Sequence, residues 1–275
     1  MKGVLYVVAT PIGNLEDITL RALNVLKEVD IIAAEDTRHT LKLLNHFGIK
    51  KRLISYWSER EKLKAQEITE RLNEGLSVAL VSDAGTPGIQ DPGGELVRRA
   101  IEAGVEVVAV PGPSASIAAL SVSGLDTSEF TFIGFLPSKK SERAKKLKEL
   151  AVEERTLIFY EAPHRLIDTL SAMEETFKER NAALAKEITK MHEEVIRGGF
   201  RHILDVLEGR TIAGEYVIVV EGRPRRAEGA PLPVEEALAE VKALMKKGSG
   251  RKEAVKSVAE SYGLSKKELY DRSLQ

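Results

Sequence analysis

Two loops rich in glycine, proline and serine follow apolar segments in the first half of the chain. Residues 80–94 read LVSDAGTPGIQDPGG, and residues 110–116 read VPGPSAS. Each loop ends an apolar run typical of a buried strand, because its composition cannot continue the strand. Neighbouring parallel strands carry their small-molecule site at their carboxyl ends, and glycine lets a ligand approach the backbone closely. The two loops therefore predict a binding cleft.

The familiar nucleotide-binding motifs do not occur at the expected places. The first apolar run, residues 5–9, leads into TPIGNLED with the single glycine Gly13, whereas a dinucleotide site needs GxGxxG there. The phosphate-binding pattern GxxxxGK[ST] is absent from the whole sequence. Glu35 and Asp36 follow a second apolar run, where an acid can hold a ribose or simply cap the next helix. Position alone leaves both interpretations open.

Positive charge is concentrated in two segments, although the net charge of the chain is −1. Residues 138–148 carry six cations against one acid, and residues 242–275 carry nine cations against four acids. Such runs are often only solvated helix faces. Two of them on an otherwise acidic chain favour a polyanionic partner such as nucleic acid.

The composition excludes several other classes of site. The chain has no cysteine, which rules out disulfides and thiolate ligands, and its five histidines lack HxH or HExxH spacing. No metal is therefore expected. No apolar run approaches the ~18 residues of a membrane span, and the N-terminus does not resemble a signal peptide. We expect a cytoplasmic protein.

Apolar runs and amphipathic segments alternate along the first 222 residues, which predicts the α/β class. We expect an N-terminal α/β domain over residues 1–122, containing the glycine-rich loops, and a second α/β domain over 123–222. Residues 223–233 are rich in proline, glycine and arginine and are predicted to be a linker. Residues 234–275 are predicted to be a basic helical module of helix-turn-helix type.

Eight segments of the chain together carry a family resemblance. In order they read LYVVATPIGNLEDIT, AAEDTRHT, LVSDAGTPGIQDPG, VPGPSAS, FIGFLPSK, FYEAPHR, AKEITKMHEE and GEYVIVVEG. This series resembles the ribosomal RNA small subunit methyltransferase I family, whose members are class III, tetrapyrrole-methylase-like enzymes that use S-adenosylmethionine. The combination of EDTR, SDAGTPGI and FYEAPHR is specific, and the resemblance covers essentially the whole chain.

The resemblance implies a fold, a cofactor and a substrate. Two α/β domains would enclose S-adenosylmethionine in the cleft between them, and the chain would form a homodimer. The expected reaction is 2′-O-methylation of a cytidine ribose in the decoding region of 16S ribosomal RNA, with the small subunit as partner. S-adenosylmethionine has no phosphates and carries a positive sulfur, which agrees with the lack of phosphate-binding motifs.

The resemblance also implies roles for individual residues, carried over motif by motif. The cofactor-binding candidates lie in the glycine-rich loops and in FYEAPHR: Pro11, Asp83, Ala84, Gly85, Thr86, Pro87, Gly88, Ile89, Ser114, Ala115, Tyr160 and Glu161. The RNA-binding candidates are the cations and one histidine of the basic segments and loops: Arg38, Lys139, Lys140, Arg143, His164, Arg165, Arg251 and Lys252.

Methyl transfer to a ribose hydroxyl needs in-line alignment of oxygen, carbon and sulfur, and gains from a general base. The catalytic candidates are charged residues of the cleft-facing loops: Asp36, Arg38, Glu161 and Lys186. Glu35, His164 and Glu187 accompany them. Each has a structural alternative, because Arg38 can bind phosphate and Lys186 can end a strand in an ion pair.

Two other functions remain open at this stage. A related class III methylase would act on a tetrapyrrole or a protein side chain, and a non-catalytic ribosome-binding protein would keep only a vestigial cleft. The EDTR and FYEAPHR loops and the basic C-terminal segment favour RNA, and the intact glycine-rich loops favour an active enzyme.

Overall fold

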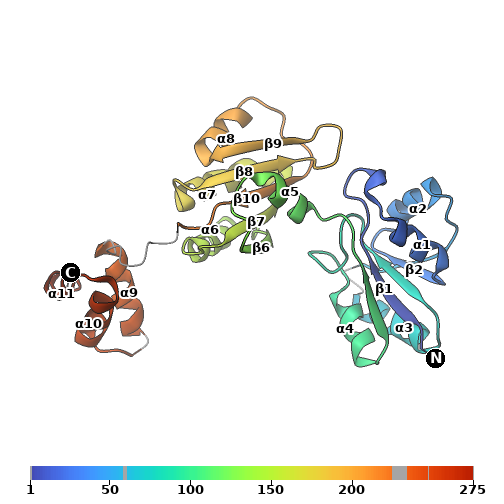
Figure 1. Ribbon diagram of the computed structural model, residues 1–275, viewed down its shortest axis with the longest axis horizontal. Helices are drawn as coiled ribbons and strands as arrows, with labels where there is room; N and C mark the ends of the chain where they lie inside the picture. Colours follow the sequence, from blue (N-terminus) through green and yellow to red (C-terminus); the bar gives the residue numbers. More distant parts are fainter. Residues whose placement is uncertain (1, 58–60, 225–233, 247, 275) are drawn as a thin grey trace. The chain divides into compact units, whose positions relative to one another are not determined.

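The computed structural model describes residues 2–57, 61–224, 234–246 and 248–274. The chain separates into two compact units, Met1–Arg223 and Pro224–Gln275 (Figure 1). The predicted linker, 223–233, lies outside the described residues except for its first two positions. The first unit contains two five-stranded sheets, and the α/β class is confirmed.

The first sheet is parallel throughout, in the order β3-β2-β4-β1-β5. Its strands are β1 (Val4–Val8), β2 (Ile31–Ala34), β3 (Arg52–Ser55), β4 (Val78–Val81) and β5 (Glu106–Val110). Every residue of β2 and β4 is buried, as expected for inner strands covered on both faces. All five strands therefore end at one edge, where the predicted loops begin.

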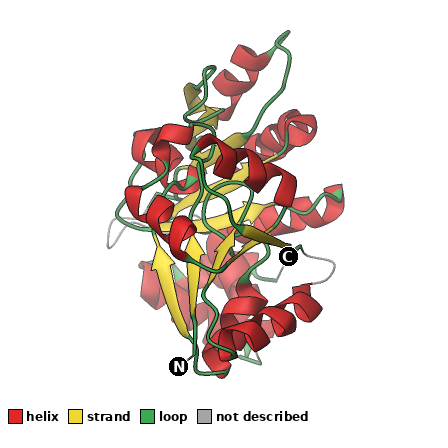
Figure 2. Ribbon diagram, turned by 90° about the vertical axis from the view of Figure 1, so that its right-hand side faces the viewer, coloured by secondary structure: helices red, strands yellow, loops and turns green. Residues whose placement is uncertain are grey.

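Helices cover both faces of this sheet (Figure 2). One face carries α1 (Leu20–Glu28) and α2 (Thr37–His46), and the other carries α3 (Glu61–Asn73) and α4 (Gly94–Glu102). A short 3-10 turn, Leu15–Asp17, precedes α1. We call this part of the first unit, up to the end of β5, the N-terminal lobe.

The second sheet is mixed, in the order β6-β7-β10-β8-β9. Its strands are β6 (Phe130–Phe135), β7 (Thr156–Glu161), β8 (Asn181–Lys186), β9 (Glu194–Gly199) and β10 (Tyr216–Val220). Only β6 and β7 are parallel neighbours, because β10 runs antiparallel to both β7 and β8. We call this sheet with its helices the second lobe.

One face of the second sheet packs against α6 (Lys140–Leu150), α7 (Leu166–Phe177) and α8 (Phe200–Leu207), with the 3-10 turn Pro163–Arg165 before α7. The other face packs against α5 (Ala115–Ser123), whose Ala119 and Leu120 are buried beside Val219. The packing places α5 with the second sheet, so the boundary between the two sheets and their helices lies before α5 and not at 122/123 as predicted.

The second unit is helical. It contains α9 (Val234–Lys246), α10 (Arg251–Tyr262) and α11 (Lys266–Arg272), packed around Ala237, Val241 and Val258. Left-handed Gly263 ends α10, and the Ser265 side chain caps α11 by accepting from the amide of Glu268. In the part of the chain that the structure describes, we find no helix with the length and apolar character of a membrane span.

Candidate active site

The loop after β4 is fastened to the loop after β1 by the backbone. The amide of Thr10 donates to Gly85 (2.9 Å) and the amide of Gly85 donates back to Thr10 (3.0 Å). The buried hydroxyl of Thr10 also donates to the carbonyl of Ser82 (3.1 Å). Gly85 and Gly88 have φ values of +78° and +81°, which only glycine adopts without strain. The positive φ values explain why this loop needs these two glycines.

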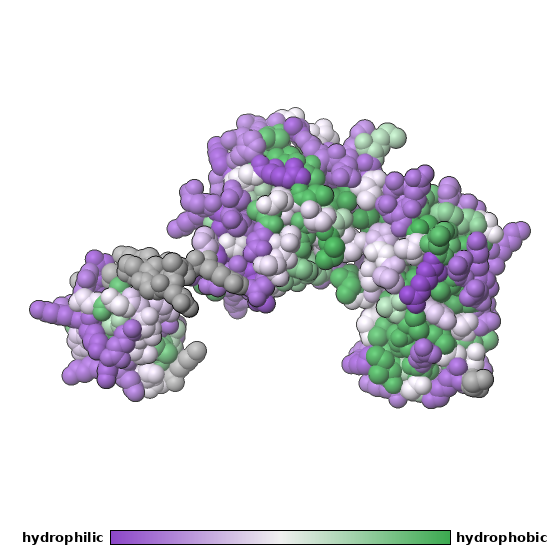
Figure 3. Space-filling view, viewed as in Figure 1, coloured by the Kyte–Doolittle hydropathy of each residue, from purple (hydrophilic) through white to green (hydrophobic). Residues whose placement is uncertain are grey.

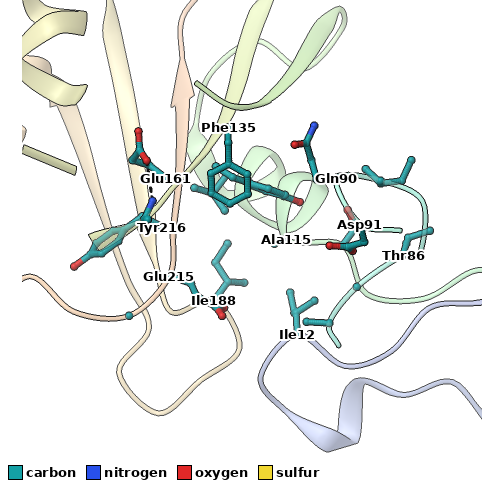
Figure 4. Close-up of a pocket in the computed structure, with 18 of the residues that line it drawn as sticks. Ile12, Thr86, Gln90, Asp91, Ala115, Phe135, Glu161, Ile188, Glu215 and Tyr216 are labelled. Carbon is teal, nitrogen blue, oxygen red and sulfur yellow. Dashed lines mark hydrogen bonds between the residues drawn. The ribbon is translucent and has the colours of Figure 1, made fainter. Parts of the chain in front are cut away.

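A cavity of about 400 Å³ lies between this loop and the second lobe, and we call it the interlobe cavity (Figure 4). Residues from loops and strand ends of both lobes line it: Ile12, Ala84, Gly85, Thr86, Ile89, Gln90, Asp91, Ser114, Ala115, Phe135, Tyr160, Glu161, Ala162, Pro163, Ile188, Gly214, Glu215, Tyr216 and Val217. None of these described lining residues is a lysine or an arginine. The rings of Phe135 and Tyr160 meet edge to face, 5.7 Å apart.

The structure brings together eight of the twelve predicted cofactor residues in this wall: Ala84, Gly85, Thr86, Ile89, Ser114, Ala115, Tyr160 and Glu161. Pro11 and Asp83 instead line a separate cavity of about 180 Å³, next to α2. Pro87 and Gly88 are absent from the linings of both cavities.

Sequence reasoning missed several lining residues from both lobes: Ile12, Gln90, Asp91, Phe135, Ala162, Pro163, Ile188, Gly214, Glu215, Tyr216 and Val217. All eleven stand inside the motifs that carried the family resemblance, so the motifs located the wall. The residue types within these motifs did not indicate which side chains line the cavity.

Glu161 is buried, with 2% of its surface exposed, and both of its carboxylate oxygens are engaged. One oxygen accepts from the Thr169 hydroxyl (2.6 Å), and the other accepts from the amide of Ala162 (2.9 Å). The latter oxygen also lies 3.3 Å from Nε of Arg165. This carboxylate is placed to hold the wall in position, which disfavours its predicted role as a base.

Arg165 is a predicted RNA contact, but its guanidinium points into the second lobe. Besides facing Glu161, it donates to the carbonyls of Leu136 (2.8 Å) and Pro137 (3.2 Å). Its side chain is 18% exposed, so a phosphate would have to displace these partners. The neighbouring His164 is exposed.

Asp36 caps α2, Arg38 stands in its first turn, and both are absent from the lining of the interlobe cavity. Asp36 caps α2 by accepting from the amide of Arg38 (2.8 Å), and its two oxygens bind the Arg38 guanidinium at 3.2 and 2.8 Å. These hydrogen bonds lower the pKa of Asp36 to about 2. Asp36 is therefore a poor proton acceptor. The side chain of Arg38 is 88% exposed, so its guanidinium is accessible from solvent.

Lys186, the fourth catalytic candidate, ends β8. Its backbone pairs in register with Tyr216 and Glu194, and its side chain is absent from the cavity lining. The structure thus does not bring Asp36, Arg38, Glu161 and Lys186 together at one point.

Asp91 behaves differently from these candidates. It lines the interlobe cavity, and burial together with the negative charge of Glu35 raises its pKa from about 3.8 to about 6. Burial also raises the pKa of Glu35, with the charges of Asp83 and Asp36 adding to the effect. Within the described residues, no group of three or more acidic or histidine side chains is arranged to hold a metal.

The predicted RNA contacts on α6 divide into exposed and buried side chains. Lys139 and Lys140 are exposed at the start of the helix. Arg143 is only 5% exposed and donates to the carbonyl of Ser138 (3.4 Å). It shares the inward face of α6 with Leu147 and Leu150, which corrects its assignment as a phosphate contact.

The second unit has a groove of about 290 Å³ between α10 and α11. Four lysines contribute to its lining, which consists of Lys252, Val255, Lys256, Lys266, Lys267, Tyr270 and Asp271. Predicted contact Lys252 is in this lining, and the partly buried Arg251 precedes it. We call this feature the lysine groove; hydrophilic residues predominate on the face of this unit seen in Figure 3.

The chain matches a known protein family, and it is similar to known proteins in sequence and in fold. Residues 4–203 match the family of tetrapyrrole (corrin/porphyrin) methylases. The chain is similar to ribosomal RNA small subunit methyltransferase I of Synechocystis (48% identity, 99% of this chain and 98% of that one). It is similar to the protein of the same name from Halalkalibacterium halodurans (45% identity, 98% and 94%). Its fold resembles that of uroporphyrin-III-C-methyltransferase from Thermus thermophilus (TM-score 0.54, 23% identity, 80% and 94%).

Proposed function

The chain belongs to the tetrapyrrole methylases and to the ribosomal RNA small subunit methyltransferase I family, and we propose from this premise that its substrate is the decoding region of 16S ribosomal RNA. It is an S-adenosylmethionine-dependent methyltransferase. We propose that it methylates the ribose 2′-oxygen of a cytidine there. The interlobe cavity is the observation that carries this proposal.

The lining of the interlobe cavity fits S-adenosylmethionine. Its volume of about 400 Å³ is in the usual range for a small-molecule site. Bare backbone at Gly85 permits close approach, and the hydroxyls of Thr86 and Ser114 offer polar contacts. A cationic sulfonium suits a wall that has carboxylates and aromatic rings but no lysine or arginine. When bound, the cofactor supplies an activated methyl group.

The contribution of the protein is chiefly orientation. The paired loops at Thr10 and Gly85 fix one side of the cavity, and the anchored carboxylate of Glu161 fixes the other. A rigid wall of this kind would hold the bound cofactor in one orientation toward the ribose oxygen. Oriented binding can supply roughly 7–11 kcal/mol of a reaction barrier.

RNA binding is proposed for the exposed cations that lie outside the cavity. Arg38 presents its guanidinium beside the N-terminus of α2, and Lys139 and Lys140 are exposed on α6. Lys252 stands in the lysine groove. Phosphate contacts of this kind position RNA without reading its sequence.

Two further parts of the proposal concern assembly and location. Exposed apolar side chains on α5 and at the start of β6, namely Ile117, Val122 and Phe130, are 50%, 42% and 41% exposed. They support the homodimer that the family resemblance implies. Action on the small ribosomal subunit would take place in the cytoplasm.

Mapping of ribose methylation tests this function. Total RNA from cells with and without the protein would be compared at every 2′-oxygen of the small-subunit RNA. The proposal expects one cytidine in the decoding region to lose its methyl group in the cells without the protein. Unchanged ribosomal RNA would favour a tetrapyrrole or protein substrate, or a non-catalytic role.

A further inference from the structure

A small pocket lies beside α2 in the N-terminal lobe, and the proposed function leaves it without a role. Its volume is about 180 Å³, and we call it the α2 pocket. Pro11 and Leu43 contribute apolar side chains to its lining. Thr40, Lys42 and Asp83 add a hydroxyl, a cation and a carboxylate. An apolar lining with a few polar groups is typical of a site for a small organic group.

The hydroxyl of Thr40 is the unusual feature of this pocket. Thr40 is only 3% exposed, on the buried side of α2. The other two hydroxyls of the lining are occupied, because Thr10 donates to the carbonyl of Ser82 (3.1 Å) and Ser82 donates to the carbonyl of Ala84 (3.3 Å). Among the described residues we find no hydrogen-bonding partner for the Thr40 hydroxyl. Since buried polar groups are normally hydrogen-bonded, this hydroxyl indicates a polar ligand in the pocket.

The α2 pocket and the interlobe cavity share a wall. This wall consists of the segments after β1 and β4, which are joined by the mutual backbone bonds of Thr10 and Gly85. After β1, Thr10 lines the pocket and Ile12 lines the cavity (Figure 4). After β4, Ser82 lines the pocket and Ala84 lines the cavity. The two spaces are therefore neighbours, separated by the thickness of two chain segments.

Two exposed cations of α2 lie beside the pocket. Arg38 stands in the first turn of the helix with its side chain 88% exposed, and Lys42 follows it by four residues. Residues at this spacing share one face of a helix. A phosphate can therefore be bound on the same face of α2 that contributes Thr40 and Lys42 to the lining.

The chemistry of the lining fits a pyrimidine base better than a phosphate. A base has two apolar faces, which suit Pro11 and Leu43, and an edge that carries both donors and acceptors. The Thr40 hydroxyl can donate or accept, Lys42 can donate, and the carboxylate of Asp83 can accept. The edge of cytosine has an amino donor, which a carboxylate can bind. The same carboxylate disfavours an anion inside the pocket.

We propose that the α2 pocket holds the base of the cytidine that is methylated, with Thr40 bonded to its polar edge. This inference rests on the proposed function. The base leaves its stack in the RNA, as in other enzymes that act on extruded nucleotides. Its ribose then lies at the wall shared with the interlobe cavity, and its phosphate lies near Arg38. The pocket thereby sets the position of the 2′-oxygen relative to the cofactor.

Thr40→Val tests the hydrogen bond, because valine keeps the shape of the side chain and removes the hydroxyl. The loss of one hydrogen bond should lower kcat/KM for isolated small subunits by about 2- to 13-fold. The affinity for S-adenosylmethionine should not change, because Thr40 is absent from the lining of the interlobe cavity. The slope of log K against log salt for RNA binding should not change either, because a base contact releases no counterions.

Thr69→Val is the matched control. It removes a hydroxyl from α3 of the same lobe, and that hydroxyl donates to the carbonyl of Ala65 (2.7 Å) in its own helix. Its kcat/KM should equal that of wild type.

A unique thiol tests whether RNA occupies the pocket. The chain has no cysteine, so Leu15→Cys gives a single thiol in the lining, at a position that is 39% exposed. Modification with N-ethylmaleimide should abolish methyl transfer by this variant and leave its cofactor affinity unchanged. Small subunits should protect the thiol from the reagent. Leu20→Cys, at an 80% exposed position of α1, is the control and should stay active after modification.

Several results would overturn the proposal. Wild-type kcat/KM for Thr40→Val, or full activity of the modified Leu15→Cys protein, would show that no base enters the pocket. A reduced salt slope for Thr40→Val would make the pocket a phosphate site, and a lost affinity for S-adenosylmethionine would make it part of the cofactor site. Failure of the proposed function is distinct, because the wild-type protein would then methylate no subunit RNA, whether or not subunits protect the thiol.

Discussion

The interlobe cavity and the lysine groove differ most in the charge of the side chains that line them. The cavity contains Asp91, Glu161 and Glu215 but no lysine or arginine, whereas the groove contains four lysines. A wall of acids and aromatic rings suits a small cation, and a wall of lysines suits a phosphate backbone. On the proposed function, the chain thus binds its cationic cofactor and its anionic substrate at separate sites.

The two sites also differ in how rigidly they are held. Backbone hydrogen bonds between Thr10 and Gly85 fasten one wall of the cavity, and buried Glu161 fastens the other. The four lysines of the groove are exposed side chains on α10 and α11. Rigid positioning is what an in-line reaction needs, and flexible cations are sufficient to hold a polyanion.

The largest expected effect is that of Gly85→Val on the cavity. The added side chain would enter the space for the cofactor, and overpacking of roughly 1–3 kcal/mol corresponds to about 5- to 150-fold in affinity. Calorimetric titration with S-adenosylmethionine measures this loss. Because Gly85 has a φ of +78°, valine also strains the backbone and should lower the melting temperature.

Gly124→Val separates strain from obstruction, because Gly124 has the same φ of +78° but nothing within 4 Å of its added Cβ. It should lower the melting temperature and leave cofactor affinity unchanged. Equal loss of affinity in both variants would show that the Gly85 effect is one of folding alone.

The next effect concerns the lysine groove. Lys252→Gln combined with Lys267→Gln should weaken RNA binding about fivefold for each lost phosphate contact near 0.1 M salt. The slope of log K against log salt should fall by roughly 0.7–0.9 per contact. Lys27→Gln with Lys50→Gln removes the same charge from exposed sites of the N-terminal lobe and should leave the slope unchanged. An identical slope in all three proteins would mean that the groove is only a solvated surface.

Arg38 and Arg143 offer a comparison between an exposed and a buried guanidinium. Arg38→Ala should weaken RNA binding about fivefold and reduce the salt slope by about one contact, with cofactor affinity within a few-fold of wild type. Arg143→Met should change neither the slope nor the affinity, since Arg143 is 5% exposed. A reduced slope for Arg143→Met in salt titrations would contradict its buried position.

The smallest effect is on stability, through Asp91. Its pKa of about 6 in the folded protein exceeds the ordinary value near 3.8, so ionisation destabilises the fold. This cost is complete above pH 6 and disappears as the pH falls toward 4. The partly exposed position keeps it to about 1 kcal/mol, or about 2–4 °C in melting temperature. Asp91→Asn should therefore melt higher than wild type at pH 8 and equally at pH 4; equal melting at both values would contradict the raised pKa.

The sequence predicted the α/β class and eight of the nineteen residues of the cavity wall, because glycine-rich loops after buried strands have few alternative geometries. It misplaced α5, whose apolar residues and serines are spread around the helix and give no periodic signal for the sheet that they cover. The buried face of Arg143 was present in the sequence, since Arg143, Leu147 and Leu150 recur at helical spacing. The surrounding run of lysines concealed it.

The inward-facing carboxylates of the cavity could not be identified from the sequence for a different reason. Asp36 and Glu161 are chemically suitable carboxylates, and only their three-dimensional partners disqualify them. Asp91 stands in the same motif as the cofactor loop. The residue before it, Gln90, is left-handed and its side chain lies over Gly134, a residue far away in the sequence.

The most direct test of the central claim is reconstitution with labelled cofactor. The full chain would be incubated with methyl-labelled S-adenosylmethionine and small subunits from cells that lack the protein, and the RNA would be digested to nucleosides. We expect label in 2′-O-methylcytidine, from one site in the decoding region of each subunit. Label on a base, label in protein, or no label at all would contradict it.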